Sequence, residues 1–559
     1  MRKKKRILSF LLVFVFLVTA LAGCGDVYTS SESNLTQEEA EKELSSLLSK
    51  IESKSVDSPT LDIYSTETSE ADTLADIDTF QTTVKGNGDI NLEVAGATEM
   101  TSDESPDDWL TIVAERFNKE KYKINGKTVS ITVRQITSGE VVTYMEAGAY
   151  EPDIFVPSAY PWEMMLEASG IQPIQLTDRI AGNTAGILMK QDVYDAFIEK
   201  YKEATLSNVI TAAIAGDVTF AYPNPYTSTT GLNGIGAILQ AFDPENPLSS
   251  NAASQLMEYQ KTSPPVAYTT AVLRDQAAKG VINAMLMEEQ AYINSATLEG
   301  YTYIPFGVRH DHPAYTFDYC TSEEQEAAQA FIDYCLEEKN QKLATEKGFN
   351  RHDDYESQDP GFSGADWINA QQIWNDNKSG GKPIIAAFVA DTSGSMDGEP
   401  LNSLKTSLVN TSSYIKEGNY IGLVSYNSDV TVNLPIAKFD ATQRAYFSGE
   451  VKNMTAGGST ATYDAVLVAL DMLEKAAEDV GDAKLMLFLL TDGEQNVGYS
   501  YNRVAPVIGG LEVPVYTIAY NYSDDGELEE LSSINEAAAL NADSDNIVNL
   551  LRNLFNAEI

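Results

Sequence analysis

Short apolar segments alternate with amphipathic ones from residue 89 to about residue 350 of the chain. INLEVAGA, VSITVRQI and DIFVPSA have the length and composition of strands, and DDWLTIVAERFNKE has the apolar spacing of a helix. This alternation predicts an α/β domain, which we place at residues 89–360. It ends in a Ser-, Asp- and Gly-rich stretch, HDDYESQDPGFSGAD, so residues 361–381 are predicted to be a linker.

The last part of the chain, residues 382–559, has strands that are apolar on both faces. PIIAAFVAD, KLMLFLLTD and VPVYTIAYN show no alternation, and each runs into a polar turn. Buried strands joined by helical crossovers indicate a mostly parallel sheet. Helices are predicted between these strands at residues 400–416, 462–479 and 527–540.

The N-terminus has the pattern of an export signal. A basic run, RKKKR, precedes an apolar run that ends at Ala22 and is shorter than the roughly 20 residues of a membrane-spanning helix. Leu21-Ala22-Gly23-Cys24 resembles the lipobox of bacterial lipoproteins. The resemblance implies a signal peptide at residues 1–23, lipid on Cys24, and an extracytoplasmic protein anchored to the cell membrane. The alternative is an ordinary secreted protein with a chance cysteine.

Residues 24–88 are rich in Ser, Thr, Asp and Glu and have few aromatic residues, a composition that cannot bury a core. They are predicted to form an acidic tether. One short helix is expected within it, because Thr36 and Glu39 have the spacing of a capping box and the residues from Ala40 to Ile51 present an apolar face. A helix that frays or packs on the next domain is favoured over one with a docking role.

Composition limits the possible partners. The 559 residues, 43% of them hydrophobic, are enough for two globular domains, and 38 basic against 82 acidic residues give a net charge of −44. Such a polyanion is repelled by nucleic acid, so no nucleic-acid partner is expected. Cys320 and Cys335 are predicted to be buried free thiols, because a helix from Ser322 would hold them about 20 Å apart.

Three separate segments supply oxygen donors at predicted strand ends. DTSGSM places Asp391, Ser393 and Ser395 on one turn, Thr460 follows Gly457-Gly458, and Asp492 ends another strand. Carboxylate and hydroxyl oxygens suit a small hard cation. Ser459 and Thr462 are alternatives to Thr460. Each fragment could also be an Asx turn or a helix cap, but all three together predict a metal site.

Those motifs resemble the von Willebrand factor A domain, with its Rossmann-like fold and metal-ion-dependent adhesion site, over residues 382–559. The resemblance implies that Ser393 and Ser395 coordinate the metal directly, Thr460 directly or through water, and Asp391 and Asp492 mainly through water. One coordination position would stay open for a carboxylate of a protein partner. Mg²⁺ is the expected cation, with Mn²⁺ or Ca²⁺ as alternatives.

Residues 89–360 resemble the two-lobed, type 2 extracellular solute-binding proteins, whose ligand lies between the lobes. The string NPYTSTTGL carries hydroxyls just before a predicted helix, where an anion would be favoured. The expected ligand-binding residues are Thr98, Ser158, Tyr160, Ser228, Thr229, Thr230 and Gly231. The hydroxyls could instead only cap the helix.

The charge of the expected solute stays open, because NPYTSTTGL has no Lys or Arg. A small polar solute, an anionic solute or none are the alternatives. Arg309 and His310 could add positive charge to the site. His310 and His312 could hold a metal, but this His-x-His pair has no third ligand, and the favoured interpretation is that it lies on a surface loop without a metal.

No nucleophile, general base or catalytic metal motif is present, so an enzyme is not predicted. The favoured hypothesis is a surface-anchored, metal-dependent binding or adhesion protein. The alternative is the substrate-binding lipoprotein of an ABC-type transporter with an accessory von Willebrand factor A domain. In the favoured hypothesis, the order of the domains places the metal-binding domain furthest from the membrane.

Overall fold

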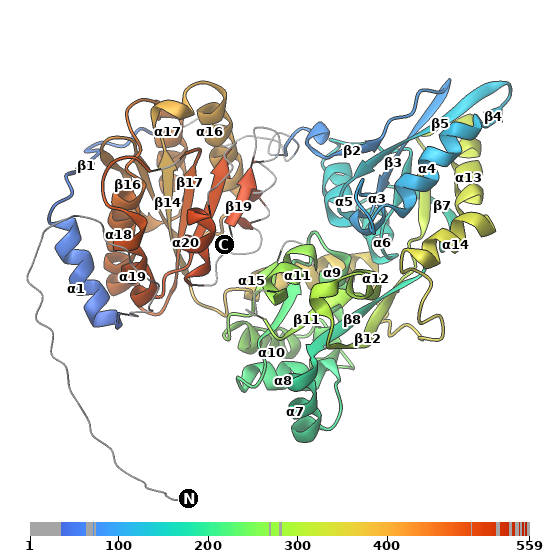
Figure 1. Ribbon diagram of the computed structural model, residues 1–559, viewed down its shortest axis with the longest axis horizontal. Helices are drawn as coiled ribbons and strands as arrows, with labels where there is room; N and C mark the ends of the chain where they lie inside the picture. The colour runs from blue at the N-terminus through green and yellow to red at the C-terminus, as the bar shows by residue number, and fades with distance from the viewer. Residues whose placement is uncertain are drawn as a thin grey trace, which may run out of the picture.

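The computed structural model describes two bodies (Figure 1), built from residues 35–62, 71, 74–267, 270–278, 282–493, 495–520, 526–535, 539–542, 547, 551–552 and 554–555. The predicted signal peptide and Cys24 lie outside these residues. Within them, no helix combines the length and apolarity that crossing a membrane requires.

Lobe 1 of the middle domain is built on a mixed sheet with the order β2-β5-β3-β6-β13-β7, and β4 pairs with β5. The strands are β2 (Thr82–Val84), β3 (Ile90–Gly96), β4 (Lys123–Ile124), β5 (Lys127–Gln135), β6 (Ile154–Val156), β7 (Pro173–Thr177) and β13 (Ala314–Phe317). Its helices are α3 (Thr98–Thr101), α4 (Trp109–Glu120), α5 (Ser138–Glu146), α6 (Pro161–Ala168), α13 (Ser322–Cys335) and α14 (Glu338–Glu346). The apolar faces of α4 and α13 meet the buried residues of β3 and β5 in one core.

Lobe 2 has a second sheet with the order β10-β9-β11-β8-β12. The strands are β8 (Asn183–Lys190), β9 (Phe220–Pro223), β10 (Val266–Ala267), β11 (Ala284–Glu288) and β12 (Tyr301–His310). Its helices are α7 (Gln191–Tyr201), α8 (Leu206–Ile214), α9 (Thr229–Phe242), α10 (Ser250–Gln260), α11 (Thr270–Ala278) and α12 (Glu289–Ile293). The chain crosses between the lobes from β7 to β8 and from β12 back to β13.

The prediction of a linker at residues 361–381 is wrong over most of that range. Helix α15 (Gly364–Asn377) occupies it and packs against α6 of lobe 1 and against α9 and α10 of lobe 2. Trp367 and Trp374 are fully buried on one face of α15, at the seven-residue spacing that recurs on a helix. The helix was not predicted from the sequence, because the stretch before it is rich in Gly and Asp and indicated a loop. Because α15 touches both lobes, it belongs to the middle domain.

The C-terminal domain confirms the predicted mostly parallel sheet. Its strands are β14 (Ile384–Asp391), β15 (Tyr420–Tyr426), β16 (Val430–Lys438), β17 (Lys484–Thr491), β18 (Val515–Tyr520) and β19 (Ala539–Ala542). Only β15 and β16 pair antiparallel among the described strand pairs of this sheet. The helices are α16 (Glu399–Thr411), α17 (Ala441–Asn453), α18 (Thr462–Val480), α19 (Tyr501–Leu511) and α20 (Glu527–Ser533). The helix predicted at residues 527–540 is therefore too long, because the chain enters strand β19 at Ala539.

The N-terminal segment is not the tether that its composition predicts, because residues 35–62 pack on the C-terminal domain. Helix α1 (Gln37–Leu48) has the expected capping box and lies against α19 and α18 (Figure 1). Strand β1 (Ser53–Ser55) pairs in parallel with β16 and so extends the sheet at its edge. The Asp62 N–H then donates to the Ala445 carbonyl oxygen of α17 (3.0 Å). The helix thus packs on the last domain, not on the next one.

This packing also fixes which domain the described chain reaches first. Leu35, at the start of the described chain, lies against Gly510 of α19, where an added Cβ would be 2.9 Å from the Leu35 carbonyl oxygen. The N-terminal segment therefore reaches the C-terminal domain before the chain reaches the middle domain.

Cys320 and Cys335 are both free and buried, as the sequence predicts. Burial raises the pKa of each thiol, so both sulfurs are held in the protonated form.

Candidate functional site

Strands β14 and β17 bring the two predicted aspartates to one edge of the C-terminal sheet. They are parallel neighbours with Ala390 opposite Leu490, so Asp391 at the end of β14 and Asp492 just after β17 face the same edge. Carboxyl ends of parallel strands are the usual ligand-binding edge of such sheets.

Ser393 and Ser395 link these two aspartates through one backbone N–H and two hydroxyl groups. The Ser393 N–H donates to Asp391 Oδ1 (2.8 Å), the Oγ atoms of Ser393 and Ser395 lie 3.0 Å apart, and the Ser395 hydroxyl donates to Asp492 Oδ1 (2.7 Å). Asp391 and Ser393 are buried, whereas Ser395 is exposed. Four of the five predicted metal ligands therefore form one continuous row of oxygens that opens to solvent at Ser395.

Thr460 reaches this row through its loop. The Gly394 N–H donates to the Gly458 carbonyl oxygen (3.1 Å), and the Gly457 N–H donates to the Thr392 carbonyl oxygen (2.9 Å). Gly458 has a φ of +86°, a left-handed conformation that glycine adopts without strain. The loop that carries Thr460 thus lies beside the row. Among the described residues, no hydrogen bond joins the Thr460 hydroxyl to the other four predicted ligands.

Three residues that the sequence reading did not select hold the predicted ligands. The hydroxyls of Thr491 (2.7 Å) and Tyr426 (3.4 Å) donate to Asp391 Oδ2. Asn496 Oδ1 accepts from the Thr460 N–H (2.9 Å), and its Nδ2 donates to Thr460 Oγ1 (3.4 Å). Thr491 precedes Asp492 directly in LLTDG, so a polar residue ending a buried strand was an available signal.

The alternatives to Thr460 fit the row less well. The Thr462 hydroxyl donates to the Tyr426 hydroxyl (3.4 Å), behind Asp391, and the Ser459 N–H is held by the Ser428 hydroxyl (2.9 Å) on an exposed loop.

The electrostatics of the row favour a cation. Burial raises the pKa of Asp391, with the charge of Asp492 as a smaller cause, and burial also raises the pKa of Asp492. Two partly desolvated carboxylates at one edge are stabilised in their charged form by a hard cation. The described residues contain no cluster of three or more His, Cys, Asp or Glu in metal-binding geometry. Any cation here would therefore depend on the serine and threonine hydroxyls, a donor set that fits Mg²⁺ with retained water.

A cavity of about 330 Å³ lies between the lobes of the middle domain. Its lining includes Thr98, Ser158, Ser228 and Thr229, which the sequence predicts as ligand-binding residues. The lobes meet beside it, where the Trp162 indole N–H donates to Thr229 Oγ1 (2.8 Å).

Tyr160, Thr230 and Gly231 do not line this cavity. The Tyr160 hydroxyl donates to Asp359, and the Thr230 hydroxyl donates to Glu288. Gly231 packs so closely on β9 that an added Cβ would lie 2.2 Å from the Pro223 carbonyl oxygen. Ser228 caps α9 through the Gly231 N–H (3.4 Å), so its hydroxyl serves the helix end as well as the cavity wall.

The charges of the lining do not fit an anionic solute. Three carboxylates, those of Glu99, Asp107 and Glu288, line the cavity together with one guanidinium, that of Arg274. The sequence predicted hydroxyl groups on both lobes but none of these carboxylates, because Glu99, Asp107 and Glu288 come together only in the fold.

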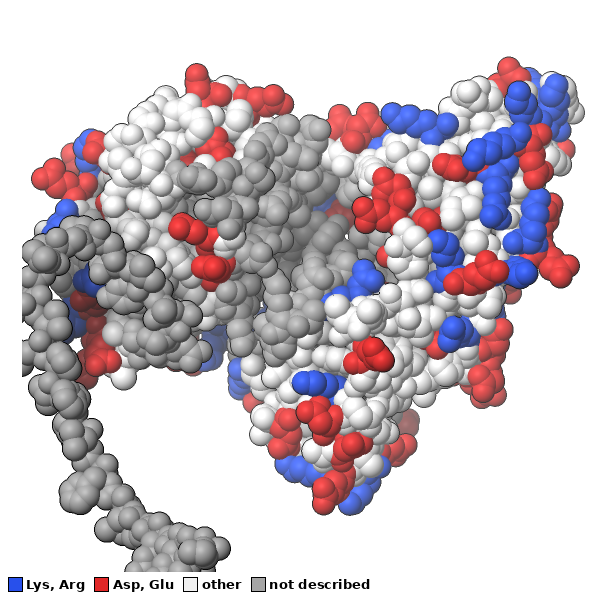
Figure 2. All heavy atoms as spheres, viewed as in Figure 1, with Lys and Arg blue, Asp and Glu red and all other residues white. Residues whose placement is uncertain are grey.

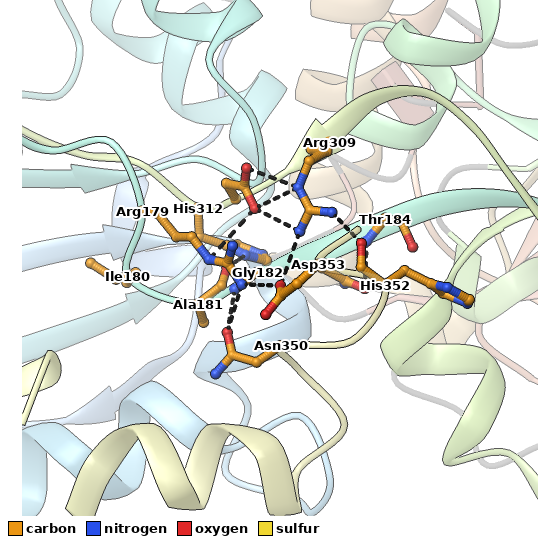
Figure 3. A network of polar contacts seen from close by, with 12 residues as sticks. Arg179, Ile180, Ala181, Gly182, Thr184, Arg309, His312, Asn350, His352 and Asp353 are labelled. Atoms are coloured by element: carbon orange, nitrogen blue, oxygen red, sulfur yellow. Dashed lines mark hydrogen bonds and ion pairs between the residues drawn. The ribbon is translucent and has the colours of Figure 1, made fainter. Parts of the chain in front are cut away.

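Arg309 does not add charge to the cavity, because it lies where the chain crosses between the lobes (Figure 3). Its Nη1 donates to the His352 carbonyl oxygen (2.6 Å), and its Nε and Nη2 donate to the Asp311 carboxylate (3.1 Å). Arg179 comes from the other crossing and donates to Asp353 (2.6 Å). This network joins both crossings to the chain that follows α14.

His310 and His312 are fully buried, so the surface interpretation of this pair is wrong. Burial lowers the pKa of His310 to about 3, which keeps its ring neutral. His312 faces two acceptors, the Ala181 carbonyl oxygen at Nδ1 (2.8 Å) and Glu99 Oε1 at Nε2 (3.0 Å). The hydrogen bond with His312, with a coulombic attraction as a smaller cause, holds the pKa of Glu99 down at about 2 despite burial.

The fold and these two sites define a class of binding protein, with a two-lobed periplasmic-binding-protein-like domain followed by an α/β domain with a strand-end site. Comparison with known families gives the same division. Residues 99–350 match the family described as bacterial extracellular solute-binding protein, and residues 387–555 match the von Willebrand factor type A domain. The chain is thus a fusion of these two domains, both of which are binding domains rather than catalytic ones.

The curated relatives match part of the chain. Inter-alpha-trypsin inhibitor heavy chain H3 of Bos taurus is 29% identical over 194 residues, 32% of this chain and 21% of the relative. The uncharacterized protein sll0103 of Synechocystis is 24% identical over 140 residues, 25% of this chain and 32% of the relative. The chain spans about a fifth of the length of the heavy-chain relatives.

Solved structures resemble each domain. Iron-bound HitA from Pseudomonas aeruginosa is 14% identical, with a TM-score of 0.38, over 52% of this chain and 99% of that one. A von Willebrand factor type A structure from Catenulispora acidiphila is 18% identical, with a TM-score of 0.29, over 31% of this chain and 42% of that one.

Proposed function

We propose that the protein is a lipid-anchored, extracytoplasmic binding protein that engages a carboxylate of a protein partner through a divalent cation at Asp391, Ser393, Ser395, Thr460 and Asp492. The observation that carries this proposal is the continuous row of oxygens from Asp391 to Asp492, open to solvent at Ser395. The cation is Mg²⁺ in the first place, with Mn²⁺ or Ca²⁺ as alternatives. Cell adhesion is the role that this chemistry serves.

The residues around the row have separate tasks in this proposal. The hydroxyls of Ser393 and Ser395 offer direct ligands, and the Thr491 hydroxyl and the Ser393 N–H hold the Asp391 carboxylate in place. Asn496 fixes Thr460 from behind. A bound cation would supply a positive charge with an open position that accepts an oxygen from outside.

The charge of the C-terminal domain supports a cation as the bridge. Residues 382–559 include 10 basic and 25 acidic side chains, and red acidic groups stand out on the visible part of this domain, whereas Lys and Arg gather over lobe 1 (Figure 2). A carboxylate-bearing partner is repelled by such a surface. A divalent cation between the two carboxylates removes that repulsion at the point of contact.

The interlobe cavity favours a second role, the binding of a small solute by the middle domain. This role belongs to the alternative function, a substrate-binding lipoprotein of an ABC-type transporter. The two roles occupy different domains and do not exclude one another.

Metal binding is tested on the full chain by titration with Mn²⁺, with free Mn²⁺ measured by electron paramagnetic resonance. The native chain is expected to bind a single Mn²⁺ that EDTA removes. Asp391→Ala and Ser395→Ala are each expected to lose more than the about 10–100-fold in affinity that removal of an outer-shell partner costs. Asp397→Ala, an exposed change of equal charge on the same loop, is the matched control and is expected to bind like the native chain.

Partner binding is tested by capture of surface proteins with the native chain and with Ser395→Ala, in Mg²⁺ and in EDTA. Capture that needs both Mg²⁺ and Ser395 supports the proposal. Capture that is the same in EDTA, or the same for the variant, would show that the partner is held elsewhere on the protein.

A further inference from the structure

The wall of the interlobe cavity on lobe 2 contains two buried acceptors without donors. Glu288, the last residue of β11, is 6% exposed, and its Oε1 accepts from the Thr230 hydroxyl. No described residue hydrogen-bonds to its Oε2, although the Thr270 hydroxyl is near enough to the carboxyl to lower its pKa slightly against the effect of burial. Burying a carboxylate oxygen without a hydrogen-bond donor costs free energy, so a ligand that donates a hydrogen bond to this atom would be stabilised there.

Gln290, two residues further on, is fully buried and offers the second acceptor. Its Nε2 donates to Asp107 Oδ1 (2.8 Å), which fixes the orientation of the amide, because a carboxylate requires the nitrogen side. The Oε1 atom of Gln290 is left without a hydrogen-bond partner in the described part of the chain. A ligand that satisfies both Glu288 and Gln290 must therefore supply N–H or O–H donors.

The charges of the lining balance in pairs, with one exception. Glu99 Oε1 lies 3.0 Å from His312 Nε2, and Asp107 lies 3.9 Å from the Arg274 guanidinium. Glu288 forms no ion pair with a Lys, Arg or His of the described residues, and the charge of Glu99 adds to burial in raising its pKa. A ligand cation would supply the missing partner.

The size and lining of the cavity narrow the class of cation. A volume of about 330 Å³ is at the small end for ligand pockets. Phe80, Ile136 and Ala291 are its few apolar residues, and most of the others carry hydroxyl, amide or charged groups, so the lining suits a small ligand with polar groups.

We propose that the interlobe cavity binds a small polar amine whose ammonium group donates to Glu288 Oε2 and Gln290 Oε1. This inference rests on the solute-binding role proposed for the middle domain and is independent of the metal site. Glu288 is the residue that selects a cation, and Glu99 and Asp107 contribute a negative potential that their own partners largely cancel.

The test uses pairs of probes on the full chain, with calorimetric titration and thermal unfolding as readouts. Putrescine is compared with the diol butanediol, which matches its shape without charge, with choline, which has the charge but no N–H donor, and with sulfate as the anion. Putrescine is expected to bind and to raise the unfolding temperature, choline to bind more weakly, and butanediol and sulfate not to bind.

Glu288→Gln removes the charge and keeps the size and the Thr230 contact. It is expected to weaken putrescine binding at least about tenfold, as for loss of a charged hydrogen bond, without lowering the unfolding temperature of the unliganded chain. Glu115→Gln, an exposed change of equal charge on lobe 1, is the control and is expected to bind like the native chain.

The outcomes distinguish the amine assignment from the solute-binding role on which it rests. Binding of butanediol as tight as that of putrescine, or unchanged putrescine binding by Glu288→Gln, overturns the amine assignment and leaves the solute-binding role standing. Binding of sulfate alone overturns the amine assignment in favour of an anion. If none of the probes binds the native chain, both the amine assignment and its solute-binding basis lose their support.

Discussion

Replacing Leu44 and Leu47 of α1 together by alanine is expected to destabilise the C-terminal domain by about 2–5 kcal/mol for each residue. The two side chains are 4% and 1% exposed and belong to the same core as the buried residues of β14, α18 and α19. Calorimetric unfolding of the full chain measures the change, and the transition of the C-terminal domain should move to lower temperature. Limited proteolysis should cleave the chain near β16, because β1 no longer covers this edge of the sheet.

Ser46→Ala is the matched control for this experiment. Ser46 lies on the exposed face of the same helix, so its replacement keeps the buried face of α1 intact. A control that unfolds like the native chain, beside a double variant that does not, assigns the effect to packing. If the double variant also unfolds like the native chain, residues 35–62 are not a structural part of the C-terminal domain.

Local patterns predicted helix α1 of this segment, but neither strand β1 nor the domain on which the segment packs. The capping box of Thr36 and Glu39 and the apolar face from Ala40 are properties of a few adjacent residues, and both are present in the structure. The partner of that face, α19, lies more than four hundred and fifty residues further along the chain, as the contact of Arg503 with Glu43 shows. Nothing in a short acidic segment encodes such a distant contact, so composition alone indicated a tether.

The row of oxygens from Asp391 to Asp492 could be predicted from the sequence for a geometric reason. Parallel strands with apolar runs of similar length must end at one edge, so the residues that follow them are brought together by topology alone. The supporting hydroxyls of Thr491 and Tyr426 required the register of β14 against its neighbours, which no single segment contains.

The lining of the interlobe cavity could be predicted from the sequence only in part, because it comes from several segments on two lobes. The hydroxyls near Ser228 form a continuous motif, whereas Glu99, Asp107 and Glu288 are separated by long stretches and converge only in the folded domain. The sign of the charge in the cavity therefore follows from the fold.

A buried ion pair joins the two domains beside that cavity. Arg552, near the C-terminus, pairs with Glu140 of α5, and the two side chains are almost fully buried. Ser138 opens α5 and lines the cavity, and the Gly139 N–H donates to the Thr227 carbonyl oxygen of lobe 2 (3.3 Å). Gly139 is required there, because an added Cβ would lie 1.9 Å from the Tyr226 carbonyl oxygen. One short helix thus contacts the C-terminal domain, the cavity and the opposite lobe.

Arg552→Ala is accordingly expected to destabilise the contact between the domains by about 3–5 kcal/mol, because it removes the buried cation that balances Glu140. Unfolding in urea and small-angle scattering measure the result, and the radius of gyration should increase as the domains separate. Arg503→Ala is the matched control, since its ion pair with Glu43 is of the same type but its side chain is 56% exposed, and a loss below about 1 kcal/mol is expected. Combining Arg552→Met with Glu140→Gln removes both charges and should recover most of the stability, as for buried pairs replaced by uncharged groups. A double variant as unstable as Arg552→Ala would instead assign the loss to the packing of the arginine over Tyr144, not to its charge.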